Sequence, residues 1–301
     1  TLLHRMQGQR KSVTLVTCPP GGLTELQPAI ARALGLRAEA SFDEIGEKLD
    51  QGGDDAALLL DDAHRLIRPT MGGLDAMDRL LEVARKYSSR SAWVFAIDDV
   101  VWRFFELARG ARPAFDEALV LRRWQEEAIV RLIRLRCKEA GVTPDFSVVI
   151  DDLPADADAF DREEARQRAE IAYSRMMWDY AEGNPGLAIH AWRSCLSLAE
   201  DGAARVEPFE PADIAELERL PDASLFVLRA LVRLEDSSAR EVSDATMIPL
   251  AKVQDTLRYG QARGFVEFGD DNYSVPWPWY RAVTRFLRRR YLLHPTRPGA
   301  A

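Results

Sequence analysis

The stretch Leu58-Leu59-Leu60-Asp61-Asp62-Ala63-His64 decides how the first part of the chain folds. Its three leucines close an apolar run of strand length, and two adjacent acids follow them. At the carboxyl edge of a parallel sheet, where α/β proteins bind ligands, Asp61 could hold magnesium and Asp62 could polarise an attacking water. The alternative is a strand followed by a polar cap, with Asp62 as the N-cap. The stretch alone favours neither.

Apolar runs alternate with helical patterns throughout the first 124 residues. The expected strands are residues 12–17, 56–60, 91–97 and 115–121, and the helical periods cover 24–36 and 71–87. Continuous apolar strands between helices predict a parallel sheet that is covered on both faces. We therefore expect an α/β core over residues 1–124.

The segment after the first strand has the layout of a phosphate loop, Gly-x-x-x-x-Gly-Lys-Ser/Thr, without its chemistry. It reads Cys18-Pro19-Pro20-Gly21-Gly22-Leu23-Thr24-Glu25. Thr24 therefore occupies the position of the lysine, and Glu25 occupies the position of the serine or threonine. A glutamate at that position repels phosphate, and the main cation for the phosphates is missing. A helix N-terminus alone binds anions weakly. A plain strand–turn–helix without nucleotide fits these residues equally well.

The remainder of the chain is expected to be mostly helical. Helices are predicted over 126–140, 161–181 and 185–198, with an acidic loop over 143–160, which suggests an all-α lid over residues 125–206. Residues 207–301 predict helices over 224–234, 239–245 and 249–263, followed by strands over 264–268 and 273–275. Three helices and a hairpin are the order of a winged helix-turn-helix.

Composition excludes several classes of protein. The 301 residues carry a net charge of −8, which argues against coating nucleic acid over the whole surface. Three cysteines and four histidines show no zinc spacing and no disulfide framework, as in a reducing cytosol. No apolar run is long enough to cross a bilayer. We expect a cytoplasmic fragment of a longer protein, because the chain starts at Thr1 without a leader.

Together these segments resemble the AAA+ superfamily, near its origin-recognition and STAND-like branches, over nearly the whole chain. Residues 58–64 resemble the Walker B strand and 91–98 the sensor-1 strand, with Asp98 at its polar position. Residues 121–142 are similar to the opening of the helical lid, and 181–188 (AEGNPGLA) to its sensor-2 segment, where Gly186 replaces the expected arginine.

The resemblance implies a set of site residues. In an active ATPase, Asp61, Asp62 and Asp98 would be catalytic, with Asp61 holding magnesium. Contacts to ATP or ADP would come from Pro20, Gly21, Gly22, Thr24, Gly183 and Pro185. Because the phosphate loop is degenerate, the absence of any nucleotide or magnesium is an equal expectation.

The winged helix offers a second surface. Lys252 and Arg258 lie on its expected recognition helix, and Arg288 and Arg289 lie in the basic C-terminal helix. A DNA reader also needs cations in the wing, but the turn Gly269-Asp270-Asp271-Asn272 is acidic. Contact with a protein partner or with the rest of the chain is expected ahead of DNA, and a homo-oligomer is an option.

The preferred hypothesis is a degenerate AAA+/STAND-like module that serves as a regulatory or assembly domain of a larger protein. It would bind nucleotide weakly or not at all and would not be an enzyme. One alternative is an active magnesium-dependent ATPase with a deviant phosphate loop. Another is a DNA-binding regulator in which the winged helix dominates.

Overall fold

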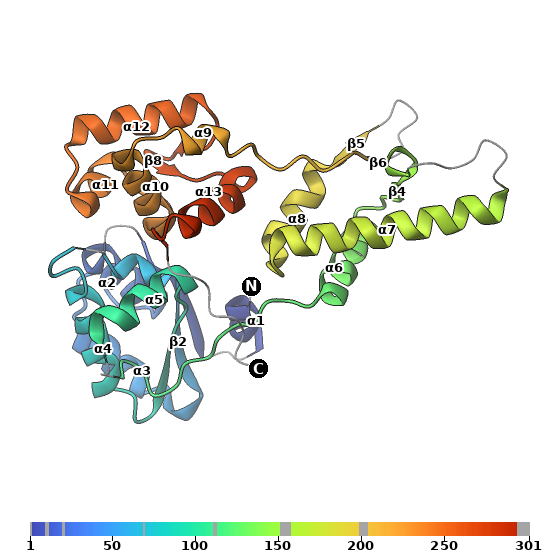
Figure 1. The fold of residues 1–301 in the computed structure, drawn as a ribbon. Helices are drawn as coiled ribbons and strands as arrows, with labels where there is room; N and C mark the ends of the chain where they lie inside the picture. The colour runs from blue at the N-terminus through green and yellow to red at the C-terminus, as the bar shows by residue number, and fades with distance from the viewer. Residues whose placement is uncertain are drawn as a thin grey trace. The chain divides into compact units, whose positions relative to one another are not determined.

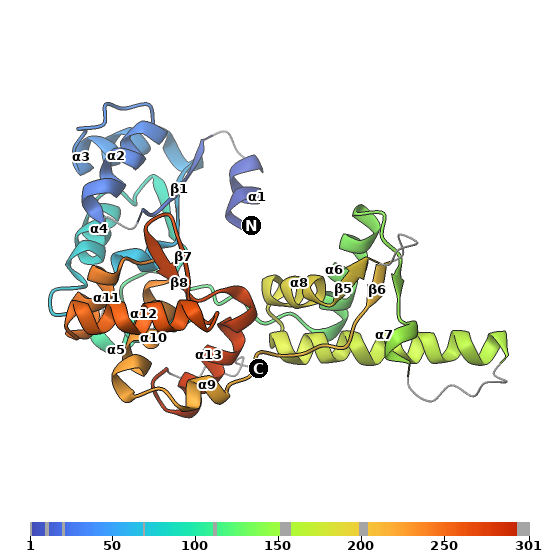
Figure 2. The same cartoon turned by 90° about the horizontal axis from the view of Figure 1, so that it is seen from above.

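The computed structural model describes residues 2–9, 12–19, 22–68, 70–110, 113–150, 158–198 and 204–293. Figures 1 and 2 show its ribbon in two views. The chain groups into two compact units. The first comprises Thr1–Ala118, Leu220–Val275 and Leu287–Thr296, and the second comprises Leu119–Arg219, Pro276–Phe286 and Arg297–Ala301. The first unit therefore combines the expected α/β core with most of the expected winged helix.

A three-stranded parallel sheet forms the centre of the first unit. Its strands are β1 (Val13–Thr17), β2 (Ala56–Asp61) and β3 (Ser91–Phe95), in the spatial order β1-β2-β3. In the register, Val16 lies beside Leu60 and Leu60 beside Phe95. The predicted α/β class is confirmed. Because the order never reverses among the described strands, right-handed crossovers place the connecting helices on one face.

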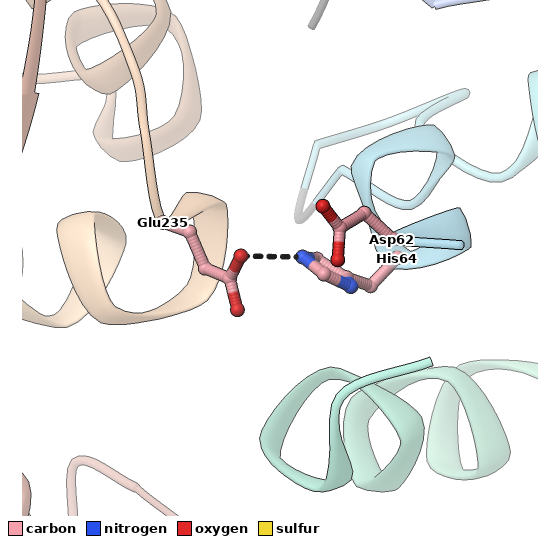
Figure 3. A group of neighbouring side chains, drawn as sticks. All are labelled: Asp62, His64 and Glu235. Atoms are coloured by element: carbon pink, nitrogen blue, oxygen red, sulfur yellow. Dashed lines mark ion pairs between the residues drawn. The ribbon is translucent and has the colours of Figure 1, made fainter. Parts of the chain in front are cut away.

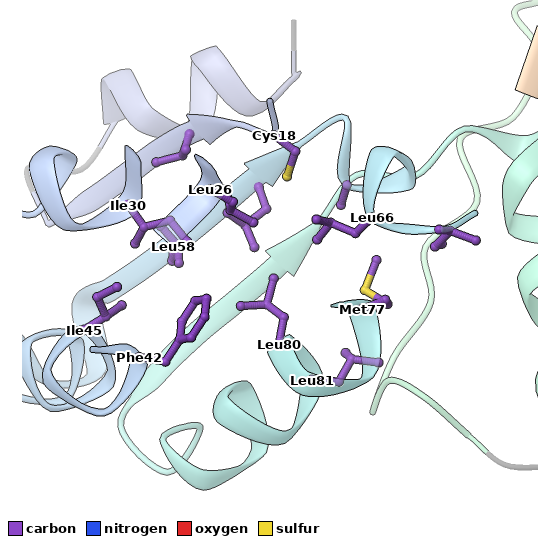
Figure 4. Packing of buried hydrophobic residues seen from close by; sticks show 14 of the residues in the cluster. Cys18, Leu26, Ile30, Phe42, Ile45, Leu58, Leu66, Met77, Leu80 and Leu81 are labelled. Atoms are coloured by element: carbon purple, nitrogen blue, oxygen red, sulfur yellow. The ribbon is translucent and has the colours of Figure 1, made fainter. Parts of the chain in front are cut away.

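Helices cover that face of the sheet. They are α2 (Leu23–Ala33), α3 (Phe42–Asp50), α4 (Asp75–Lys86) and α5 (Asp99–Arg109). Their apolar side chains, among them Ile30, Ile45 and Leu80, pack on Leu58 of β2 in one buried cluster (Figure 4). Each fully buried leucine or isoleucine contributes roughly 1.5–3 kcal/mol of transfer free energy.

The second face of the sheet is covered as well. Successive side chains of a strand alternate between faces, so Leu59 points away from the cluster that holds Leu58, yet it is also fully buried. The sequence-based prediction of a sheet covered on both faces is therefore correct. Helix α1 (Leu2–Gln9) packs beside β1.

The fourth strand expected over residues 115–121 is wrong. Phe115 packs its ring at 5.3 Å from that of Phe95 and at 5.7 Å from that of Trp102. The following Leu119 and Leu121 are 84% and 78% exposed, and no ladder forms here. Phe115 packs its ring into the core, whereas the apolar residues after it do not pair with the sheet and stay exposed.

Three helices and a hairpin follow within the first unit. They are α10 (Asp222–Leu234), α11 (Ala239–Thr246), α12 (Leu250–Ala262), β7 (Glu267–Gly269) and β8 (Asn272–Ser274). Ser238 and Glu241 form a capping box that fixes the start of α11. The tip residues Asp270 and Asp271 have φ of 51° and 64°, as in a two-residue type I′ turn. This is the order expected of a winged helix-turn-helix.

The second unit is mostly helical but contains a small sheet. Its helices are α6 (Glu126–Glu139), α7 (Ala159–Ala181), α8 (Pro185–Ser194), α9 (Ala215–Glu218) and the greater part of α13 (Trp277–Arg289). The strands β4 (Pro144–Asp145), β6 (Ala204–Val206) and β5 (Leu196–Leu198) pair in that order.

That small sheet corrects two expectations for the lid. The helix predicted over 185–198 ends at Ser194, because Leu196 and Leu198 pair with β6 instead. The loop predicted over 143–160 contributes β4. Single 3₁₀ turns occur at Gly53–Asp55, Ala63–Leu66 and Ser147–Val149. None of the helices in the described part of the chain combines the length and apolarity needed to cross a bilayer.

Candidate functional site: the acidic edge of the sheet

The ends of the three strands meet at one edge of the sheet. The Cys18 amide donates to the Asp61 carbonyl at 2.9 Å, which ties the segment after β1 to the end of β2. The Ala63 amide donates to the Ala96 carbonyl at 2.8 Å, which ties the end of β2 to the segment after β3. Asp61, Asp62 and Asp98 therefore lie on segments of the same carboxyl edge.

The three carboxylates have different local roles. Asp61 ends β2, and its Oδ1 accepts the Asp62 amide at 3.2 Å. Asp62 is left-handed (φ 52°) and makes no side-chain cap bond, so the N-cap alternative does not describe it. Its Oδ2 instead lies 3.6 Å from the Arg65 guanidinium. Asp98 is the N-cap of α5, with Oδ1 accepting the Val100 amide at 2.8 Å.

Two residues that the sequence analysis did not select complete this edge. They are Glu235, which comes just after α10, and His64, which lies in the turn after β2. Figure 3 shows that their side chains face each other, with Asp62 beside the imidazole. Glu235 Oε2 lies 3.0 Å from His64 Nε2, and the two side chains are 39% and 3% exposed. Glu235 also has a positive φ of 58°, an unusual backbone for a residue with a side chain.

A second ion pair joins the same two segments of the first unit. The Arg68 guanidinium lies 3.3 Å from Glu241, the capping-box residue of α11, 173 positions away in sequence. Glu235 and Glu241 thus both contact the segment that follows β2. The segment from the end of α10 into α11 thus supplies two acids to the strand end that carries Asp62.

Negative charge dominates the edge. Burial and, to a smaller extent, the charge of Glu235 raise the pKa of Asp62. The same two causes raise the pKa of Asp98, although the hydrogen bond from the Val100 amide acts to lower it. Burial alone would lower the pKa of His64, but Glu235 and the two aspartates outweigh it and raise that pKa. Burial works to raise the pKa of Glu235, yet His64 holds it below its usual value. The acids outnumber the cations that face them.

Around β1 the residues present do not fit magnesium-ATP. Gly22 (φ 67°) precedes α2 and gives it no side-chain cap, while Thr24 and Glu25 are exposed on its first turn. A threonine and a carboxylate stand where phosphates need a lysine and a hydroxyl. Pro20 and Gly21, two expected nucleotide contacts, lie outside the described residues.

Two hollows lie near these segments. One, of about 470 Å³, is lined by Leu23, Thr24, Gln27, Pro28, Ala38, Glu39, Phe42 and Arg79. It has the volume of a ligand site, but its charged lining is one arginine and one glutamate, which does not suit a triphosphate. The other, of about 70 Å³, lies among Arg65, Arg68 and the α10–α11 segment and has room for a few waters.

Gly183 and Pro185 belong to the second unit, where the local backbone explains both. Gly183 has φ of 72°, and its carbonyl accepts the Trp124 amide at 2.9 Å. Pro185 is the first residue of α8, which Asn184 caps by accepting the Leu187 amide at 3.1 Å. Their role as nucleotide contacts stays a prediction.

Two of the cations expected to contact DNA or protein lie on α12. Lys252 and Arg258 are exposed on α12, and Arg258 lies 3.8 Å from Asp255. At the tip of the β7–β8 hairpin, Asp270 and Asp271 are exposed.

On α13, Arg289 is exposed and Arg288 is half-buried. Within the second unit, Arg281 donates to the Tyr180 carbonyl at 2.9 Å and pairs with Glu182, so it is occupied by a structural contact. The basic run is thus less available than its sequence suggests. Arg297 lies outside the described residues.

Comparison with known proteins gives structural likeness only. No family model matches the sequence, and no curated protein is similar to it. The Walker-type ATPase PABY2304 of Pyrococcus abyssi is 15% identical (TM-score 0.37), over 91% of this chain and 84% of that one. The Aeropyrum pernix ORC1 protein, solved with DNA, is 18% identical (TM-score 0.38), over 96% and 83%.

A third solved structure, a mutant of Thermotoga maritima RuvB, is 12% identical (TM-score 0.25), over 97% of this chain and 92% of that one. From its own elements, the chain is an α/β parallel-sheet protein with a helical unit and a three-helix-and-hairpin segment.

Proposed function

We propose that this chain is an AAA+-like regulatory or assembly module that does not turn over ATP. The observation that carries the proposal is the charge on the first turn of α2. Glu25 is exposed there, beside Thr24, at the place where a phosphate loop offers a hydroxyl and a lysine. A carboxylate at a helix N-terminus itself satisfies the helix dipole, and it opposes the binding of a second anion.

The strand ends support the same proposal. Asp61, Asp62, Asp98 and Glu235 gather negative charge at the sheet edge. ATP carries several negative charges and would need cations there. In addition, ligands of open α/β sheets bind where the strand order reverses, and the described strands follow the order β1-β2-β3 without reversal.

The winged-helix segment supports action through protein contacts. Its hairpin tip is acidic, whereas DNA contact needs cations that neutralise phosphates. Apolar side chains are instead presented to solvent on the same segment: Met247 is 88% exposed and Phe268 47%. We propose that a protein partner, or another part of the full-length chain, contacts this surface.

Steady-state hydrolysis of magnesium-ATP tests the absence of turnover. The expected rate is indistinguishable from that of Asp62→Asn, because no group of the loop holds the phosphates. Turnover on the order of 1 per second or faster, abolished by Asp62→Asn and unaffected by Glu47→Gln at an exposed position of α3, would establish the active ATPase instead.

A further inference from the structure

We propose that Asp62, His64 and Glu235 form a binding site for one divalent transition-metal ion, with Zn²⁺ as its natural occupant. The site joins the end of β2 to the end of α10 within the first unit. It is separate from the magnesium role considered for Asp61, and it uses no nucleotide.

The first support is the donor set. Each of the three residues offers one ligand atom, and these atoms all lie within 4.8 Å of one another. Imidazole nitrogen together with carboxylate oxygen is a ligand combination that suits zinc, with Zn–N near 2.0–2.1 Å and Zn–O near 2.0–2.2 Å. In a tetrahedral site such ligand atoms are therefore about 3.3 Å apart.

The spacing already approaches that value on one side. His64 Nε2 and Glu235 Oε2 are 3.0 Å apart. Asp62 offers its ligand atom within 4.8 Å of the other two, and its side chain, which is 35% exposed and lies 3.6 Å from Arg65, can rotate toward them. The hydroxyl or water that completes a zinc site can enter from the same exposed side.

The second support is the unsatisfied imidazole of His64. The side chain is 97% buried, and neither ring nitrogen makes a hydrogen bond of acceptable geometry with any residue that the structure describes. Although Glu235 Oε2 is 3.0 Å from Nε2, it lies off the direction in which an Nε2 proton would point. Two ligands of one metal have this relation, because the metal, and not the second ligand, occupies the lone-pair direction.

A buried imidazole without a hydrogen-bond partner destabilises a folded protein, because its polar nitrogens lose water and gain no partner in exchange. A metal ion at Nε2 removes that cost. It also replaces the proton that His64 would need in order to pair with Glu235.

The third support is the charge balance. Among the described residues, Asp61, Asp62, Asp98 and Glu235 bring acidic groups to this cluster, and Arg65 and His64 are the basic groups that face them. A dication neutralises the excess. The imidazole ligand favours zinc and its transition-metal neighbours over magnesium, which prefers oxygen ligands only and retains its waters.

The structural consequence is a tie between two segments that are distant in sequence. Asp62 and His64 follow β2, and Glu235 follows α10. Because the site exists only when these segments are together, metal binding stabilises the folded first unit by mass action.

Zinc titration of the whole chain, free of any histidine tag and in chelator-treated buffer without nucleotide, tests the proposal. Calorimetry should give one Zn²⁺ per chain, and the melting temperature should rise with Zn²⁺ but not with Mg²⁺. His64→Ala and Glu235→Gln should each weaken binding at least about 100-fold, because even second-shell changes cost 10- to 100-fold.

The matched controls are Glu241→Gln, which removes the other ion pair between the same segments, and His190→Ala, a histidine of the second unit. Both should bind Zn²⁺ as the wild type does. Should His64→Ala fail to fold, as judged by circular dichroism, Asp62→Asn and Glu235→Gln decide the matter. Absence of stoichiometric binding, or unchanged binding in these variants, overturns the site whatever the ATPase result.

Discussion

Glu235 Oε2 lies 3.0 Å from His64 Nε2, so a residue at the end of α10 faces the turn that follows β2. Both flank Asp62, the residue that would polarise water in an ATPase. Glu235 increases the negative charge around Asp62 and Asp98. This arrangement underlies both proposals: the edge is poorly suited to triphosphate and well suited to a cation.

Asp98→Asn should stabilise the metal-free protein at neutral pH. The raised pKa of Asp98 means that folding disfavours its ionised carboxyl. The ionised carboxyl therefore lowers the free energy of unfolding at pH values above the folded pKa, and this destabilisation is lost as the pH falls through the folded pKa to 3.8. Asparagine keeps the N-cap bond to Val100 without the charge. We expect a gain of roughly 1 kcal/mol at pH 7, measured by urea unfolding in chelator.

Asp98→Ala is the control, since it removes both the charge and the cap. It should be about 1 kcal/mol less stable than Asp98→Asn. A destabilised Asp98→Asn protein at pH 7 would show that the charge of Asp98 is needed at this edge.

The sequence predicted much of this fold and only part of this site. β1, β2 and β3 were predictable because each is a short run of apolar, aromatic or β-branched residues, which is the composition of a strand. The stretch over 115–121 is apolar except for Asp116 and Glu117, but only Phe115 packs into the core. Apolar content alone does not distinguish these cases, because burial depends on neighbours from other segments.

Glu235 could not have been selected from the sequence. It follows α10 without any motif, and its importance comes from the tertiary contact with His64. His64 stood in the quoted stretch but appeared as one scattered histidine among four. Asp61, Asp62 and Asp98 were predictable because all follow strands of one parallel sheet.

Cys18 should be chemically inert in the folded protein. Burial, followed by the charge of Asp62, raises the pKa of its thiol to about 12, and the side chain is fully buried. Thiolate is the reactive form, so iodoacetamide at pH 8.5 should leave Cys18 unmodified until the chain is unfolded. Peptide mass mapping measures this. Rapid modification of native Cys18 would contradict the burial of the segment after β1.

Gly183→Ala should destabilise the second unit through its backbone alone. A Cβ there would lie 2.5 Å from the Trp124 carbonyl oxygen, and φ is +72°. We expect a loss of about 2–3 kcal/mol. Gly141→Ala is the matched control, because its φ is +67° and nothing lies within 4 Å of the added Cβ. It should cost only about 1–2 kcal/mol, and equal losses would remove the contact with Trp124 from the explanation.

DNA binding by the winged-helix segment should be weak and sensitive to salt. If Lys252 and Arg258 contact two phosphates, affinity for random duplex falls about tenfold between 50 and 200 mM salt. The double variant Asp270→Asn/Asp271→Asn should bind more tightly, because the hairpin tip loses its charge. Fluorescence anisotropy provides the measurement. Salt-resistant, sequence-selective binding that Arg258→Ala abolishes would favour the DNA-binding regulator.

The segment over residues 18–25 has the sequence layout of a phosphate loop without its charges. Calorimetric titration with magnesium-ATP of wild type, Thr24→Lys/Glu25→Ser and the charge control Glu47→Ser tests it most directly. We predict no measurable binding by wild type or by Glu47→Ser, and recovered binding by the double variant, because the lysine and hydroxyl would supply the missing contacts. Saturable binding of magnesium-ATP by the wild type would show that these residues hold the phosphates without the lysine and the hydroxyl, and would contradict the prediction.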